Sequence, residues 1–378
     1  MDLDFDRDTM AETGAPLRAA DVRRDAAVPE RPAEPRRDTG GGRGHDRLRA
    51  VGAGAGALSL TWLVFGWIAP FDGLIGFVTV AYVLFLALYA VLVALDEDGP
   101  AVRDRIAAAA VHSIAFLLLS TLAFIVLFTM WSGREALSHL NFYVEDMAEA
   151  GPLDPLTKGG IVHAVVGTLV QITLALSVTL PLGLATAVFL AETRGAFTRF
   201  VRTVVEAMTA LPSIVAGLFV YAALILGLGV PTSGFAASMA ISVMMLPIVI
   251  RASDVVLRVV PGSLREASLA LGASTWRTVW HVVLPTARSG LATALILGSA
   301  RGLGETSPVL ITAGATTHLN ADPFSGPQVS LPLATFNLIR SPQLTMVARG
   351  FGAAAVLMVV VLVLFAFGRY LGRARKGR

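Results

Sequence analysis

The sequence predicts an all-α protein that crosses a membrane several times, and three observations support this fold class. Of the 378 residues, 55% are hydrophobic and only 15% are charged, and the mean hydropathy of +0.69 lies outside the soluble range. Runs of about 20 apolar residues recur along the chain, and each is long enough to cross roughly 30 Å of hydrocarbon as a helix. The runs are uniformly apolar rather than alternating, which favours helices over strands.

Eight runs reach the length of a membrane-spanning helix. Pro181 and Pro212 lie inside two of them and predict kinks, because proline cannot donate the backbone hydrogen bond of a helix interior. The expected spans cover approximately residues 51–70, 73–95, 109–131, 161–191, 207–229, 233–250, 289–314 and 350–371.

The first 50 residues have the composition of a disordered tail. They contain ten Arg and eleven Asp or Glu, with scattered Pro, Gly and Ala and almost no large apolar residue. A cleavable signal peptide would place its apolar segment near the start, whereas the first apolar run begins only around Val51. We therefore expect a solvated tail, residues 1–50, that stays in the mature protein.

The distribution of basic residues predicts the orientation in the membrane. If the tail is cytoplasmic, the later inner segments hold fifteen Arg and Lys residues, and the outer segments hold only four. The two longest outer loops, residues 132–160 and 315–349, are therefore poor in basic residues despite their length. Because basic residues concentrate on the cytoplasmic side, both termini are expected to be cytoplasmic in a multi-pass cell membrane protein.

A charged break from Asp96 to Arg105 divides the expected spans into two groups. Two additional N-terminal spans and their linker occupy residues 51–105. A six-span domain occupies residues 106–378. The sequence gives no physical account of the first pair, and simple packing is the expected role for it.

A polar segment, residues 261–285, lies between two apolar runs on the expected cytoplasmic side. Pro261 ends the preceding span, and Ser263 with Glu266 forms the S-x-x-E pattern of a capping box at the start of a short helix. Gly272 is placed to close that helix in the left-handed conformation.

A second short helix is expected to complete this hairpin. Ser274 can cap its start, Trp276 and Trp280 are four residues apart and share one face, and Pro285 is expected to mark its end. The exposed tryptophans suit the groove of a partner protein. The alternative from spacing alone is that Glu266 is only a cap and the tryptophans lie at the membrane interface.

The hairpin resembles the coupling signature of ABC importer permeases, E-A-A-x3-G-x9-I-x-L-P. Ser268 replaces the second Ala and Val282 replaces the Ile. This resemblance implies a six-helix importer core of type I and a hairpin that docks onto a separate ATP-hydrolysing subunit. The residues to which it assigns the coupling role are Glu266, Ala267, Gly272, Leu284 and Pro285.

The chain itself lacks the features of an ATPase or a metalloenzyme. It has no G-x-x-x-x-G-K-[ST] motif, and its two lysines are Lys158, in an outer loop, and Lys376, in the C-terminal tail. It has no cysteine, and the isolated His112, His163 and Gln171 favour packing roles over metal binding. We therefore expect no cofactor in this chain, no enzymatic activity, and ATP bound by a partner subunit.

Arg301 and Glu305 form an ion pair candidate inside the expected span 289–314. Counting from Gly290 at 1.5 Å per residue places Arg301 roughly 17 Å into the membrane, where charged residues usually face a bundle interior or a water-filled path. One interpretation is a packing ion pair, aided by the close helix approach that Gly298 and Gly302 allow. The other is that Arg301 binds an anion in transit while Glu305 competes for the same guanidinium.

The surrounding segments resemble the phosphate-specific ABC permeases of the PstA type. ARGLGETSPVL, residues 300–310, resembles A-R-x-x-G-E-T-A-P-L-L, and LPSIVAGLF, residues 211–219, resembles P-S-I-V-x-G-L-F. GGIVHAVVGTL, residues 159–169, resembles the start of the second span of that family. The resemblance covers roughly residues 109–372 and implies a substrate path that includes Arg301, Glu305, Thr306 and Ser307.

These features together predict a permease subunit of an ATP-driven phosphate importer. The resemblance implies a second, PstC-like permease, two ATPase subunits and an extracytoplasmic phosphate-binding protein as partners, and no nucleic acid. An ABC permease for another oxyanion, such as sulfate or molybdate, is the alternative. An intramembrane enzyme or sensor is a third class, but the sequence shows no catalytic pair for it.

Overall fold

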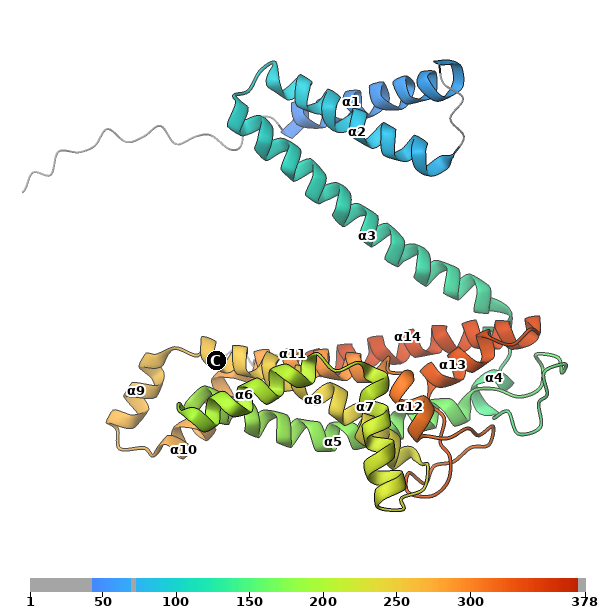
Figure 1. Ribbon diagram of the computed structural model, residues 1–378, viewed down its shortest axis with the longest axis vertical. Helices are drawn as coiled ribbons and strands as arrows, with labels where there is room; N and C mark the ends of the chain where they lie inside the picture. Colours follow the sequence, from blue (N-terminus) through green and yellow to red (C-terminus); the bar gives the residue numbers. More distant parts are fainter. Residues whose placement is uncertain (1–42, 69–72, 373–378) are drawn as a thin grey trace, which may run out of the picture. The chain divides into compact units, whose positions relative to one another are not determined.

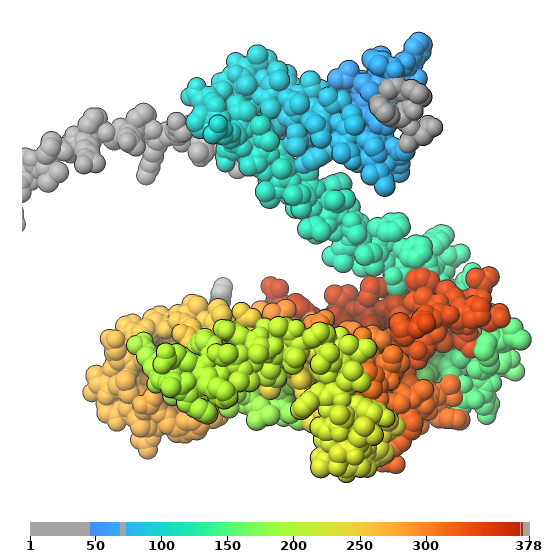
Figure 2. Space-filling model, viewed as in Figure 1, coloured from blue at the N-terminus to red at the C-terminus, as the bar shows by residue number. Residues whose placement is uncertain are grey.

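The computed structural model describes residues 43–68 and 73–372, and all regular structure in these ranges is helical. The chain divides into two compact units, one up to Leu118 and one from Leu119 onward. The division falls inside helix α3 (Gly99–Leu137) rather than at the charged break, so the predicted domain boundaries stay a prediction. Figure 1 shows the helices and Figure 2 the packed surface.

The first unit is a helical hairpin followed by the start of α3. Helix α1 (Arg43–Leu63) continues into a π-helical segment, η1 (Val64–Ile68), and packs against α2 (Leu74–Ala94). Residues 43–50, which the composition assigned to the disordered tail, are helical, and the tail before them lies outside the described residues.

Ion pairs tie the helix ends of the first unit together. Arg49 lies 2.5 Å from a carboxylate oxygen of Asp96, at the turn between α2 and α3. Arg105, on α3, pairs with Asp46 on α1 and lies 3.5 Å from Glu97. The charged break in the sequence is therefore a cluster of mutually paired charges at one end of the hairpin.

Four long helices lie side by side in the second unit (Figure 1). They are α5 (Val162–Glu192), α8 (Gly234–Val259), α11 (Leu284–Leu303) and α14 (Leu344–Gly372). Buried apolar side chains from several elements, including Ile172, Ile241, Met245 and Leu303, form the main core. The end of α3 joins this unit where Gly133 lies against α14.

The run at 207–229 does not form one continuous span. Its first residues end the amphipathic helix α6 (Ala196–Thr209), and the rest forms α7 (Ser213–Val220) and its π-helical extension η2 (Tyr221–Gly227). The two parts meet at 109°. Pro212 stands at the bend in an extended conformation, so the kink expected at this proline is a complete break.

The run at 289–314 is also displaced from its expected limits. One helix runs continuously over Thr275–Leu303 and includes α10 (Thr275–Thr278), the π-helical η3 (Val279–Val283) and α11. Pro285 therefore does not end the second hairpin helix; it occupies the first turn of α11 directly after the π-helical turn. The wider turn accommodates the missing proline N–H. The chain then breaks and resumes as α12 (Ser307–Thr312).

Length and composition give seven helices able to span a membrane among the described residues, or eight if the bent α6–α7 pair counts as one span. The eight spans expected from the sequence are therefore reached only if the bent α6–α7 pair is one span. The loops around α4 (Asn141–Val144) and before α13 (Leu331–Ile339) meet at the opposite end of the second unit from the hairpin.

Two buried or partly buried charges hold these loops. Arg349 is 1% exposed and donates to the carbonyl oxygens of Pro155 at 2.8 Å and Lys158 at 2.7 Å. Asp146 accepts the N–H of Ala148 at 3.0 Å and that of Leu319 at 2.9 Å. These two backbone hydrogen bonds hold the pKa of the Asp146 carboxyl below its ordinary value.

Candidate functional site

Arg301 and Glu305 meet where α11 ends. An Arg301 Nη2 nitrogen lies 2.9 Å from Glu305 Oε1, so the ion pair predicted from their spacing is formed. Glu305 itself lies beyond the last helical residue, Leu303, in the break before α12. Arg301 stands two residues before the end of the helix that runs over Thr275–Leu303, and its expected position near the middle of a membrane span stays a prediction.

The two charges have very different environments. The Glu305 side chain is 5% exposed, whereas the Arg301 side chain is 52% exposed. Their contact is an ion pair without hydrogen-bond geometry, because Glu305 Oε1 accepts no directed bond among the described residues. The guanidinium N–H groups therefore remain able to bind an anion that approaches from the exposed side.

Polar side chains from other elements surround the buried carboxylate. Thr168 and Gln171 on α5 and Ser330, just before α13, line a cavity of about 10 Å³ with Glu305. Gln171 Nε2 donates to the carbonyl oxygen of Gln328 at 2.7 Å, and Thr168 Oγ1 accepts the N–H of Leu331 at 2.7 Å. Gln171 is 1% exposed, in keeping with the packing role expected of it, and it also lines the cavity beside Glu305.

Close packing against α8 fixes the helix that carries Arg301. A Cβ atom at Gly298 would lie 2.5 Å from Val249, and one at Gly302 would overlap Met245. Both glycines therefore face α8, and the close helix approach expected from their spacing is confirmed. The packing and binding interpretations of the ion pair do not exclude each other. Helix α11 packs tightly against α8 on one side, and the Arg301 side chain of the same helix is exposed.

Two of the segments that carry the family resemblance meet directly beside the ion pair. Helix α7 crosses α12 where a Cβ atom at Gly217 would lie 2.7 Å from the Cα atom of Pro308. Thr306 and Ser307, half-buried, begin α12 one and two residues after Glu305. The broken helix thus places Glu305, Thr306 and Ser307 in one turn.

The coupling hairpin, residues 261–285, lies at one end of the second unit (Figure 1). Its first helix, α9 (Gly262–Ala270), begins after Pro261 with no side-chain cap, so the predicted capping box of Ser263 and Glu266 is not formed. Because the helix starts two residues earlier than expected, Ser263 lies inside it. Gly272 has the predicted left-handed conformation, with φ of 83°.

The second helix of the hairpin follows the predicted start. The Ser274 hydroxyl accepts the N–H of Arg277 at 3.4 Å, as a cap does. Trp276 and Trp280 lie edge to face with ring centroids 5.5 Å apart, and they are 67% and 51% exposed. The sequence spacing therefore correctly predicted a shared, outward aromatic face.

Two contacts hold the hairpin to the helices that carry it, and a third joins its own two helices. Arg265 Nη1 lies 3.1 Å from Glu192 Oε1, at the end of α5, and Arg265 Nη2 donates to the carbonyl oxygen of Leu257 on α8 at 2.9 Å. The hydroxyls of Ser268 and Thr278 are 2.9 Å apart and join the two hairpin helices. Motion of the hairpin is therefore linked to α5 and α8.

The remaining coupling residues divide between surface and contact positions. Glu266, Ala267 and Gly272, on the hairpin, are exposed, and Pro285 is exposed as well. Leu284 is half-buried and packs against a small apolar cluster below the hairpin.

Sequence reasoning missed the contacts that join distant segments. Gln171 and Ser330 line the same small cavity as Glu305, although they lie 134 residues before it and 25 residues after it in the sequence. Arg265 pairs with Glu192, which lies 73 positions away. A buried Gln on an otherwise apolar helix face was the one available signal.

Comparisons with known proteins identify the family of this chain. Residues 179–377 match the family described as "Binding-protein-dependent transport system inner membrane component". The chain is 42% identical over 212 residues to the phosphate transport system permease protein PstA 1 of Mycobacterium tuberculosis (strain ATCC 25618 / H37Rv), covering 56% of this chain and 69% of that protein. It is 32% identical over 247 residues to PstA of Pasteurella multocida, covering 65% and 85%.

A comparison with solved structures finds the MetNI methionine ABC transporter in inward-facing conformations, with a TM-score of 0.40 and 20% identity. That match covers 56% of this chain and 91% of the other chain.

The family match implies that this chain is a transporter subunit rather than an enzyme, and that it works with a binding protein, a separate ATPase and a second permease. It is a multi-pass protein of the cell membrane, and its expected all-α permease fold is confirmed. The chain belongs to the inner membrane components of binding-protein-dependent transport systems, and within that family to the PstA-type permeases.

Proposed function

We propose that this chain is the PstA-type permease subunit of an ATP-driven importer and that it moves inorganic phosphate across the cytoplasmic membrane. The observation that carries this proposal is the half-exposed guanidinium of Arg301, held by one buried carboxylate. A planar guanidinium can bind phosphate through two parallel hydrogen bonds.

The neighbouring Glu305 gives a physical reason for release. A carboxylate 2.9 Å from the guanidinium competes with the incoming anion for the same charge, so the anion is bound weakly enough to leave again. Thr306 and Ser307 can offer hydroxyl groups to the same anion, since they stand in the turn that follows Glu305.

The exposure of Arg301 also supports a second permease. A path for an anion must be shielded from lipid, yet 52% of the Arg301 side chain is uncovered in this chain alone. A PstC-like subunit facing Arg301 would complete the path. Two ATPase subunits and an extracytoplasmic phosphate-binding protein complete the proposed assembly.

We further propose that both termini and the coupling hairpin are cytoplasmic. Closure of the ATPase subunits would move the exposed face of Glu266, Ala267 and Gly272, and the Arg265–Glu192 ion pair would transmit that motion to α5. Leu284 and Pro285 join the hairpin to α11, which carries Arg301. A rigid-body change of this kind can open one side of the bundle and close the other.

Uptake of radiolabelled phosphate by the reconstituted complex tests this function. Arg301→Gln should reduce uptake by about a hundredfold, since hydrogen bonds to charged groups are worth about 1.5–3 kcal/mol each. Arg340→Gln, on an exposed arginine that stacks on Phe336, is the matched control and should leave uptake unchanged. Uptake that persists in the assembled Arg301→Gln complex would remove the proposed role.

Competition by other oxyanions tests the substrate in the same assay. We expect excess unlabelled phosphate to compete, and sulfate and molybdate to have little effect. Stronger competition by sulfate or molybdate would favour the alternative, an importer of another oxyanion.

A further inference from the structure

The small cavity beside Glu305 is lined by three buried polar side chains, each with an oxygen atom that forms no hydrogen bond among the described residues. Gln171, Glu305 and Ser330 are 1%, 5% and 3% exposed and line one cavity of about 10 Å³. The oxygens are Gln171 Oε1, Glu305 Oε1 and Ser330 Oγ. Because an unpaired buried polar atom is costly, three of them at one cavity indicate a polar occupant.

Ser330 stands at the start of α13, yet its hydroxyl does not cap that helix. A serine in this position usually accepts an N–H from the first turn of the helix. Here Thr168 on α5 accepts the N–H of Leu331 at 2.7 Å and donates its own hydroxyl to the carbonyl oxygen of Ala164 at 2.8 Å. The Ser330 hydroxyl is therefore available to the cavity, whereas that of Thr168 is fully used.

The orientation of the Gln171 amide follows from its other contact. Its Nε2 donates to the carbonyl oxygen of Gln328 at 2.7 Å, so the nitrogen faces that carbonyl and Oε1 is left as a free acceptor. The same segment lies directly on α5, because a Cβ atom at Gly167 would overlap the carbonyl oxygen of Val329. One wall of the cavity is therefore fixed by backbone contacts and by two hydrogen bonds.

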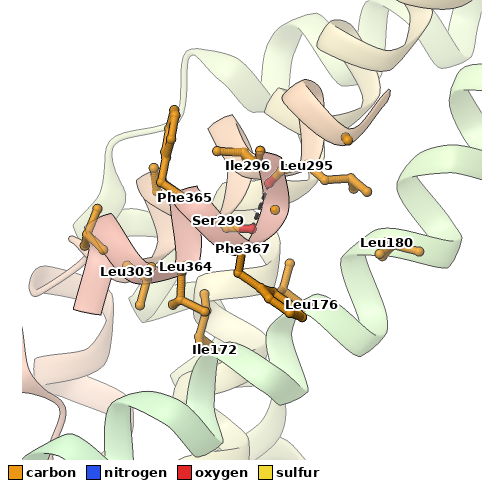
Figure 3. Close-up of a pocket in the computed structure, with 14 residues that line it drawn as sticks. Ile172, Leu176, Leu180, Leu295, Ile296, Ser299, Leu303, Leu364, Phe365 and Phe367 are labelled. Atoms are coloured by element: carbon orange, nitrogen blue, oxygen red, sulfur yellow. Dashed lines mark hydrogen bonds between the residues drawn. The ribbon is translucent and has the colours of Figure 1, made fainter. Parts of the chain in front are cut away.

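A larger cavity nearby has the opposite character. It measures about 270 Å³ and is lined by apolar side chains of α5, α11 and α14, including Ile172 and Leu303, which also line the small cavity (Figure 3). Ser299 is the one polar side chain among its described lining residues, and its hydroxyl donates to the carbonyl oxygen of Leu295 at 2.7 Å. Of these two cavities, the small one alone is lined by unpaired polar atoms of the described residues.

We propose that one buried water molecule occupies the small cavity, donates hydrogen bonds to Glu305 Oε1 and Gln171 Oε1, and accepts one from the Ser330 hydroxyl. The cavity reaches the roughly 10 Å³ that a water molecule needs, and a buried water requires two to four polar partners. Two acceptors and one hydroxyl donor match the hydrogen-bonding groups of water. A cation fits less well, because Arg301 already lies 2.9 Å from the same carboxylate oxygen and would repel it.

The water makes Gln171 and Ser330 positioning residues for the buried carboxylate. Held by the water, Glu305 does not turn to form two parallel hydrogen bonds with Arg301, which explains why their close contact lacks hydrogen-bond geometry. The guanidinium thereby keeps its N–H groups for the anion. This last consequence rests on the proposed role of Arg301 in the substrate path, whereas the water site itself does not.

Ser330→Ala distinguishes a water-bound hydroxyl from an unpaired one by the sign of its effect on stability. If the hydroxyl binds the water, its loss should lower the melting temperature of the purified complex by about 2–4 °C. Removal of an unpaired hydroxyl should leave the melting temperature unchanged or raise it, and that result would overturn the proposal.

Two further variants control this measurement. Ser330→Thr keeps the hydroxyl and should retain the melting temperature of the native complex. Thr335→Val removes another buried hydroxyl that forms no hydrogen bond among the described residues, but Thr335 does not line the cavity. Its melting temperature should not fall. An equal fall in Thr335→Val and Ser330→Ala would show that the effect is not specific to the cavity and would overturn the assignment.

Phosphate uptake tests the positioning role. Ser330→Ala should raise the KM of uptake about fivefold and change the maximal rate less than twofold, because the freed carboxylate competes more strongly for Arg301. Ser330→Thr should restore the native KM. A native KM in Ser330→Ala, or a change confined to the maximal rate, would contradict positioning.

A density map of the complete complex that resolves ordered water gives the direct check. A peak within about 3.2 Å of Glu305 Oε1, Gln171 Oε1 and Ser330 Oγ supports the proposal, and its absence would overturn it. Replacing sodium by choline should leave the melting temperature unchanged; a loss of stability that Ser330→Ala abolishes would identify a cation instead. The map and the melting temperatures do not depend on the cargo, so absence of phosphate uptake by the native complex would refute the proposed function alone.

Discussion

Glu305 and Glu266 are both assigned to function, yet their surroundings differ completely. Glu305 is 5% exposed and is enclosed by side chains from α5, α8 and the segment before α13. Glu266 is exposed on a short hairpin that is fastened by one ion pair and a pair of hydroxyls. The difference teaches that the proposed substrate site is positioned by this chain's own packing, whereas the proposed coupling hairpin leaves its functional face open to another protein.

The largest effect on stability is expected at the packed contact between α11 and α8, close to Glu305. Gly302→Ala places a Cβ atom onto Met245 and should destabilise the subunit by about 1–3 kcal/mol, which thermal unfolding of the purified complex would show as a lower melting temperature. Gly304→Ala is the control, because the nearest atoms to its Cβ would be 3.9 Å away. Equal melting temperatures for the two variants would mean that α11 is not held tightly against α8.

A substitution on the hairpin should leave stability unchanged and affect recruitment instead. Glu266→Lys reverses an exposed charge and should reduce co-purification of the ATPase subunit about tenfold, with unfolding of the permease unaffected. Glu149→Lys makes the same reversal at an exposed position in the loop that follows α4, at the other end of the second unit, and should have no effect. Normal co-purification and uptake in Glu266→Lys would contradict the docking role.

A smaller effect is expected from the internal fastening of the hairpin. Ser268→Ala removes one of two hydroxyls that lie 2.9 Å apart and should cost about 0.5–1.5 kcal/mol locally, seen as faster hydrogen exchange of α9 amides. Thr278→Ser keeps the hydroxyl and serves as the control. If Ser268→Ala exchanged at the native rate, the two helices would be held by other contacts.

The smallest effect is the pH dependence of stability that Asp146 contributes in the loop after α4. Because the folded protein lowers the pKa of Asp146, its contribution to stability is fully present above the ordinary carboxyl pKa and is lost as the pH falls through the lowered value. We therefore expect no change from this group between pH 6 and 8, and a loss only in strong acid. Asp146→Asn should flatten that acid dependence of thermal unfolding, and an unchanged profile would assign it to other groups.

The sequence predicted much of the local structure correctly. Gly272 adopts the expected left-handed conformation, Ser274 caps its helix, and Trp276 and Trp280 share a face. Each of these depends on residues within five positions of one another, so their spacing alone carries the information.

The helix boundaries were predicted less well, because apolar composition does not distinguish a continuous helix from a broken one. The chain breaks between Leu303 and Ser307 and bends at Pro212, although both regions read as apolar runs. Pro285, by contrast, is accommodated inside a helix by a π-helical turn. Tertiary packing compensates for lost backbone hydrogen bonds in ways that a window of residues cannot show.

By itself, the sequence determined the membrane class, the pairing of Arg301 with Glu305 and the exposed features of the coupling hairpin, because these follow from composition and from short spacings. Only the tertiary structure decided that Glu305 is buried while Arg301 is open, that Gln171 and Ser330 surround the carboxylate, and that Arg265 joins the hairpin to Glu192. The reason is physical. Burial and long-range pairing depend on which segments pack together, and that is a property of the whole chain rather than of any local pattern.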